Sequence, residues 1–207
     1  MNFLSLFVLI PLLMMAGLAL SRNMKQIRTV AVIGSSLQLV FAFIVLFLFL
    51  GERAAGNTAE MLFVADSVWY APLNIHYTVG VDGVSVAMLL LSAIVVFAGV
   101  FASWKIDPLP KEFFLWLILL SIGVFGFFIS INLFTMFMFY EIALIPMYLL
   151  IGVWGSGNKT YSAMKLTLML MGGSALLLVG ILGIYFNSSA DGNLTMNILE
   201  IAKNNAI

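Results

Sequence analysis

FFLWLILLSIGVFGFFISINLFTMFMFYEIALIPMYLLIGVW, residues 113–154, is a run of 42 residues whose strongest break is the polar group at 130–132. A helix needs about 20 mostly apolar residues to cross a bilayer, so this run has the length of two spans. We therefore predict two membrane-spanning helices, 113–131 and 133–154, joined by a tight turn. One carboxylate, Glu141, interrupts the second helix.

The whole chain is similarly apolar. Hydrophobic residues make up 63% of its 207 residues and charged residues only 9%, with a mean hydropathy of +1.15, which excludes a soluble domain. Nine Lys and Arg balance nine Asp and Glu, so no net field would attract nucleic acid. The chain has no Cys, which excludes Cys-bound iron–sulfur clusters within it. It has a single His, His76, so we expect no metal site. These features predict an all-helical integral membrane protein.

Six apolar runs are long enough to cross the bilayer. They predict a single membrane domain over residues 1–207, with an outer loop at 51–83 and an outer tail at 187–207. Within the tail, residues 194–203 favour a short interfacial helix. The predicted spans are 2–20, 30–50, 84–104, 113–131, 133–154 and 163–186.

Basic residues gather in alternate connections. The segments 21–29, 105–112 and 155–162 carry Lys and Arg, whereas 51–83 carries four carboxylates and a single Arg. Cytoplasmic loops of membrane proteins are enriched in Lys and Arg. The N-terminus is therefore predicted to lie outside.

Glu141 is the charge that needs an explanation. It lies nine residues after Asn132, or about 14 Å below the outer end of its helix, near the bilayer centre. A charged side chain at that depth costs about 2.5–3.5 kcal/mol on insertion scales, so it is expected to face a bundle interior, a cation or water. Burial disfavours the carboxylate and a nearby ammonium favours it, so a movable Lys would make Glu141 a proton carrier. The alternative is a protonated Glu141 that only links helices by hydrogen bonds.

Three neighbouring residues fit a functional pocket around Glu141. Pro146 has no N–H, so the carbonyl of Ile142 loses its helical donor and can bind water. Tyr148, seven residues after Glu141, shares its helix face; it either extends a hydrated path or anchors the inner boundary. Lys165, near the start of the last span, is a possible relay or charge partner, or a lysine that extends toward the membrane surface.

Other polar and small residues predict structural roles. Asp82 precedes the span 84–104 and is expected to cap its N-terminus. Gly123 and Gly126 in one span, and Gly172, Gly173 and Ser174 in the last, are expected to let neighbouring helices approach closely.

Three stretches together resemble one family: YTVGVDGVSVAMLLLSAI (77–94), FMFYEIALIPMYLLIGVWG (137–155) and AMKLTLMLMGGSALLLVGI (163–181). They are similar to chain M, the subunit-4 type, of the proton-pumping NADH:quinone oxidoreductase, respiratory complex I. The resemblance implies an antiporter-like fold of about fourteen helices in two inverted repeats, of which this chain supplies the N-terminal portion. It also implies that Glu141 corresponds to a fifth-span Glu that pairs, in relatives, with a Lys on a broken seventh helix.

The resemblance implies a membrane-arm subunit that couples quinone reduction to proton translocation through a Glu and Lys relay. Such a subunit has no redox centre of its own. Partner subunits bind NADH, flavin, iron–sulfur clusters and quinone. Its neighbours in the complex include other antiporter-like subunits. The expected location is an energy-transducing membrane, the bacterial inner membrane. The seventh-helix Lys would lie beyond Ile207. We therefore expect that this sequence is a fragment of a longer subunit or that another chain supplies the later helices. We expect no proton transport by this chain alone. The alternatives are a multisubunit sodium/proton antiporter subunit and a non-transporting scaffold.

Overall fold

The computed structural model describes residues 3–70, 75–188 and 194–204, and six long helices dominate it. All six are long and apolar enough to cross a membrane, which confirms the predicted helical membrane fold with six spans. A short helix also forms within the predicted tail. In chain order the helices are the 3-10 turn η1 (Phe3–Ser5), α1 (Leu6–Leu20), α2 (Met24–Ala54), α3 (Gly83–Ala102), α4 (Pro110–Ile129), α5 (Leu133–Trp154), α6 (Lys159–Asn187) and α7 (Ile198–Asn204).

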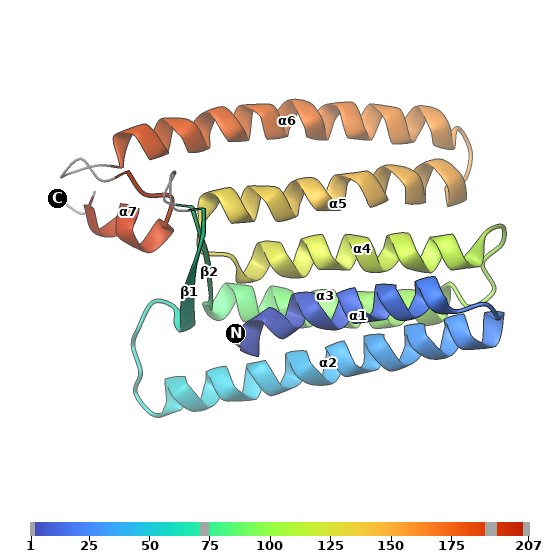
Figure 1. Cartoon of the computed structure of the whole chain (residues 1–207), viewed down its shortest axis with the longest axis horizontal. Helices are drawn as coiled ribbons and strands as arrows, with labels where there is room; N and C mark the ends of the chain where they lie inside the picture. The colour runs from blue at the N-terminus through green and yellow to red at the C-terminus, as the bar shows by residue number, and fades with distance from the viewer. Residues whose placement is uncertain (1–2, 71–74, 189–193, 205–207) are drawn as a thin grey trace.

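The six long helices lie side by side in one bundle (Figure 1). α5 packs between α4 and α6, α4 also contacts α1 and α3, and α2 packs against both α1 and α3. α6 and α2 therefore form opposite edges of the bundle (Figure 1). The connections α1–α2, α3–α4 and α5–α6 share one end, which we call the basic end because their Lys and Arg residues gather there (Figure 1).

A β-hairpin occupies much of the segment that we predicted as an outer loop. α2 continues to Ala54, and strands β1 (Leu62–Tyr70) and β2 (Ile75–Val81) then pair in antiparallel fashion. The hairpin lies at the end of the bundle opposite the basic end (Figure 1). The buried hydroxyl of Thr135, in the first turn of α5, donates a hydrogen bond to the carbonyl of His76 on β2 (3.1 Å). This bond fixes the hairpin to α5.

The turn between α4 and α5 is held from both sides. The N–H of Ile131 donates to the carbonyl of Thr78 on β2 (2.9 Å), and the N–H of Ile198 donates to the carbonyl of Ile131 (3.2 Å). The buried side chain of Asn132 accepts a hydrogen bond from the N–H of Phe134 (3.0 Å) and so caps α5. The polar break in the sequence therefore provides the backbone pairing and the cap that start α5 at a defined position.

Glycine sets how closely α4 approaches α5. A Cβ atom added to Gly123 would lie 2.8 Å from the carbonyl oxygen of Phe139 and 2.8 Å from the Cβ of Ala143, and one added to Gly126 would collide with the Phe139 ring. The predicted close approach is thus confirmed for α4. A Cβ added to Gly172 or Gly173 of α6 would meet no described atom within 4 Å, so the prediction is wrong for these two glycines within the part of the chain that the structure describes.

Candidate functional site

A cavity of about 530 Å³ lies between α5 and α6, and Glu141 lines it. The wall from α6 consists of Thr167 and Met171. The hydroxyl of Thr167 and the phenol of Tyr148 are its other polar side-chain groups. The wall from α5 consists of Phe137, Met138, Glu141, Ile142, Leu144, Ile145 and Tyr148.

The carboxyl group of Glu141 is incompletely paired. Its Oε1 atom is buried and has no hydrogen-bond partner among the described residues. A buried polar atom left without a partner costs about 1–3 kcal/mol, and such atoms are rare in folded proteins. Such a carboxyl group can lose its charge by binding a proton, or it can pair with water or with a cation. The cavity offers space for either of the last two beside Glu141.

Helix geometry brings Tyr148 to the same cavity. Glu141, Ile145 and Tyr148 recur at intervals of four and three residues, so they share one face of α5. Tyr148 is 37% exposed and lies toward the basic end from Glu141. Pro146 is buried within α5, where it leaves the carbonyl of Ile142 without a helical donor. The structure therefore brings Glu141 and Tyr148 together, with Pro146 between them along the helix.

Lys165 lies elsewhere. Its side chain is exposed and does not line the cavity, whereas Thr167, two residues later on α6, does. Two residues correspond to about 200° of rotation around a helix, so Lys165 and Thr167 point to nearly opposite sides. Among the described residues, Glu141 forms no ion pair. The structure thus does not bring Lys165 to Glu141.

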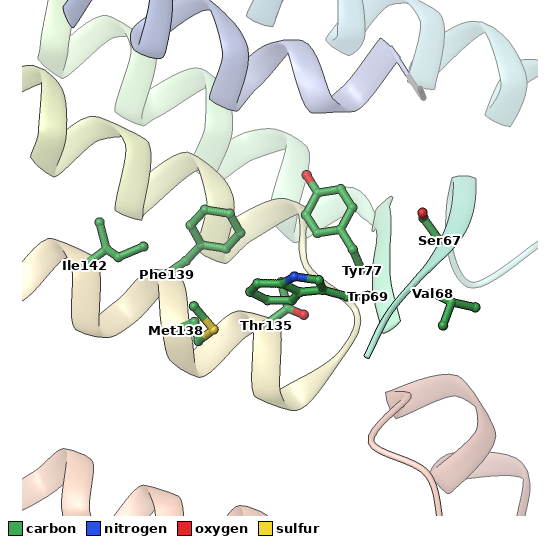
Figure 2. A pocket seen from close by; sticks show the side chains of 8 residues that line it. All are labelled: Ser67, Val68, Trp69, Tyr77, Thr135, Met138, Phe139 and Ile142. Carbon is green, nitrogen blue, oxygen red and sulfur yellow. The ribbon is translucent and has the colours of Figure 1, made fainter. Parts of the chain in front are cut away.

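A second cavity, of about 350 Å³, lies between the hairpin and the first half of α5. Figure 2 shows the indole of Trp69 reaching from the hairpin over Thr135, with Tyr77 beside it. Burial raises the pKa of the Tyr77 phenol above its ordinary value. Met138 and Ile142 line both this cavity and the one that contains Glu141. These two apolar side chains therefore separate the two cavities.

Sequence reasoning overlooked Thr167 and Met171. A hydroxyl within an apolar run is a usable signal, but α6 contains both Thr167 and Ser174. Only the packing of α6 against α5 shows that Thr167 is the one that faces Glu141.

The carboxylates of Asp66 and Asp82 have structural roles. On the hairpin, Asp66 Oδ2 lies 2.6 Å from His76 Nδ1, and the Thr78 hydroxyl donates to Asp66 Oδ1 (2.6 Å). Burial raises the pKa of Asp66, but the hydrogen bonds from Thr78 and His76 outweigh it and hold that pKa below its ordinary value. Asp82 accepts a hydrogen bond from the N–H of Ser85 (2.7 Å) at the N-terminus of α3. Within the described part of the chain, no three His, Cys, Asp or Glu residues are grouped as a metal site would need.

Residues 130–206 match the family model described as NADH:quinone oxidoreductase/Mrp antiporter, TM. The chain is 29% identical over 204 residues to NADH-quinone oxidoreductase subunit M from Rhodobacter capsulatus, a match that covers 94% of this chain and 38% of that protein. The chain spans less than two fifths of the length of the curated relatives it matches.

Two solved structures share the fold. One is respiratory complex I from Thermus thermophilus with bound NADH, with a TM-score of 0.77, 23% identity and coverage of 98% of this chain and 39% of that one. The other is the Mrp complex from Dietzia sp., with a TM-score of 0.74, 22% identity and coverage of 98% and 38%. Together with the family match, these findings confirm the resemblance predicted from the sequence.

Proposed function

We propose that this chain is an antiporter-like membrane subunit of the NADH:quinone oxidoreductase/Mrp antiporter family. In this proposal it takes part in proton translocation within an NADH:quinone oxidoreductase, with Glu141 as the proton carrier. The observation that carries the proposal is the buried Oε1 of Glu141, which has no partner among the described residues and lies beside a cavity of about 530 Å³. An ionisable side chain inside a membrane helix is costly, and such residues commonly mark ion and proton pathways.

The proposed step is the binding and release of a proton at the Glu141 carboxylate. When a cation approaches through the cavity, it stabilises the carboxylate and the proton leaves. When the cation withdraws, the carboxylate binds a proton again. Hydration on alternate sides of Glu141 would decide the direction in which the proton moves.

Tyr148 and Lys165 have different places in this proposal. The Tyr148 phenol lines the same cavity and can hold a water toward the basic end. Lys165 faces away from the cavity, so a chain of water molecules would have to connect its ammonium group to Glu141. Its role as a relay or charge partner stays a prediction.

The energy for this step would come from partner subunits. The chain contains no Cys for iron–sulfur ligation, and we propose that partners hold the iron–sulfur clusters as well as NADH, flavin and quinone. Its immediate neighbours would be other membrane-arm subunits, including antiporter-like ones. We place it in the bacterial inner membrane with the basic end in the cytoplasm and the N-terminus outside.

The test is NADH-driven proton uptake by vesicles that carry the complete complex, comparing the wild type with Glu141→Gln. Gln preserves the shape and hydrogen-bonding capacity of the side chain but cannot exchange a proton, so proton uptake and coupled turnover should collapse at matched assembly. Glu112→Gln is the matched control, because Glu112 is an exposed carboxylate in the first turn of α4 and should have no effect.

Unchanged proton uptake in an assembled Glu141→Gln complex would reject the proposal. Glu141 would then be a hydrogen-bonding contact in a non-transporting scaffold.

The second candidate is a subunit of a multisubunit sodium/proton antiporter. It is favoured by the structural match to the Mrp complex and by the family model, whose description names both classes. Sodium/proton exchange in vesicles that lack NADH-oxidising subunits separates the candidates. Exchange that persists there and is lost in Glu141→Gln would favour the antiporter.

A further inference from the structure

A groove of about 440 Å³ lies at the basic end, between the last turns of α1 and the first turns of α2. Neither the Glu141 cavity nor the hairpin contributes to it. We propose that this groove binds an anionic phospholipid, with the phosphate at Lys25 and one acyl chain along α1 and α2. Its lining consists of Gly17, Leu20, Ser21, Lys25, Gln26, Thr29 and Val30.

Positive charge gathers at the groove from two separate parts of the chain. Lys25 lines it, and Arg22 lies in the connection just before α2; both side chains are exposed. Lys111 of α4 adds a third cation, since its Nζ donates to the carbonyls of Ala19 (2.8 Å) and Ser21 (3.0 Å). None of these three cations forms an ion pair with a described residue. Basic pockets between membrane helices on the cytoplasmic side suit anionic lipid headgroups.

The hydrogen bonds around the groove leave donors for a phosphate. The Oε1 of Gln26 accepts from the N–H groups of Arg22 (3.2 Å) and Asn23 (3.4 Å), so its amide NH₂ is oriented away from them and can donate. The Thr29 hydroxyl already donates to the carbonyl of Lys25 (2.8 Å). The Lys25 ammonium and the Gln26 amide are therefore the groups that would hold the phosphate oxygens.

Apolar surface continues from the groove along both helices. Gly17 lets α1 and α2 approach closely at the floor of the groove, because a Cβ added there would lie 3.2 Å from Val30 Cγ1. Beyond it, Leu13 of α1 is 71% exposed and Ile33 of α2 is 62% exposed, and Leu37 follows one turn later. A free phosphate or an acidic protein segment would use the charges but not this apolar path. A phospholipid would use both, which is why we favour it.

The test uses the protein in bilayers that contain spin-labelled phosphatidylglycerol or, separately, spin-labelled phosphatidylcholine. The ratio of the two association constants reports the preference for the anionic headgroup. Lys25→Gln should lower this ratio about fivefold, the effect expected for one basic residue near an anionic surface. Lys25→Arg should retain it. Lys105→Gln is the matched control, because Lys105 is exposed at the same end but does not line the groove.

Three outcomes would overturn the proposal. An equal loss in Lys105→Gln would mean that diffuse surface charge, and not the groove, attracts the lipid. Loss of the preference when inorganic phosphate is added would indicate a site for soluble phosphate. A preference that is present in the isolated protein but absent in its assembled complex would indicate that a partner protein covers the groove. Circular dichroism should give equal helix content for all variants, which shows that they are compared in the same fold. The measured lipid preference does not depend on the role of Glu141.

Discussion

The two faces of α5 differ sharply. Toward α4, the helices meet through Gly123 and Gly126, which bring backbone and side chains into direct contact. Toward α6, the helices line an open cavity of about 530 Å³ beside Glu141. In the most apolar part of α4, 44% of the residues are buried within the chain, against 11% in α5 and in α6. One face of α5 therefore provides packing, and the other provides the polar site.

The difference has a physical reason. Lipid tails are as apolar as helix surfaces, so membrane helices associate through close packing of small residues and through polar contacts. The α4–α5 contact uses small residues, and it holds the backbone of α5 in place. Glu141 lies on that same helix, so a rigid contact on one side positions the carboxyl group on the other. The predictions below test this division, from the largest expected effect to the smallest.

The first prediction concerns the glycine contact. Gly123→Ala should lower the free energy of unfolding by about 1–3 kcal/mol, because the new Cβ would press on the backbone of Phe139 and on Ala143. Unfolding in mixed detergent micelles measures this loss. Gly172→Ala on α6 is the matched control and should be neutral or slightly stabilising, since its Cβ meets no described atom within 4 Å. Equal losses in both variants would remove the distinction between the two faces.

The second prediction concerns the link between α5 and the hairpin. Thr135→Val should destabilise the hairpin by about 1–2 kcal/mol, because the buried hydroxyl that donates to the His76 carbonyl is removed. Hydrogen exchange of the β2 amides measures the effect. Thr167→Val makes the same change on α6, in the Glu141 cavity, and should leave those amides protected. Faster exchange in both variants would contradict this assignment.

The third prediction concerns pH. Because the pKa of Asp66 in the folded hairpin lies below its ordinary value of 3.8, the ionised carboxylate stabilises the hairpin above that pH. This stability is lost as the pH falls through the lowered folded pKa. NMR chemical shifts of Asp66 and Thr78 should therefore titrate with a midpoint below 3.8, and Asp66→Asn should abolish the transition. A midpoint at or above 3.8 would show that the hydrogen bonds from Thr78 and His76 do not favour the carboxylate.

Much of the fold could be predicted from hydropathy. The apolar run 113–154 forms α4 and α5, and the break near Asn132 separates them. The hairpin could not be predicted in this way, because β1 and β2, with 9 and 7 residues, are too short to register as spans. They are stabilised by pairing with each other and by contacts with residues far along the chain, such as the hydrogen bond between Thr78 and Ile131.

The candidate site was only partly predictable. Glu141 stands out because a carboxylate in an apolar helix is costly, and Tyr148 follows from helical spacing. Lys165 also stands out by its charge, yet it lies on the side of α6 away from the cavity, while the less conspicuous Thr167 lines it. Charge and spacing along one helix cannot give the rotation of that helix relative to its neighbour.

The sequence by itself determined which segments cross the membrane and on which end the basic connections lie. It could do so because a backbone in lipid must satisfy its own hydrogen bonds, so that each apolar run of sufficient length becomes a helix. The tertiary structure alone decided which helix faces touch, and that Thr167 lies in the Glu141 cavity. It also decided that Gly123 packs against α5, whereas Gly172 meets no atom of the described residues. Hydropathy does not contain this information, because a helix face toward lipid and a helix face toward protein are equally apolar.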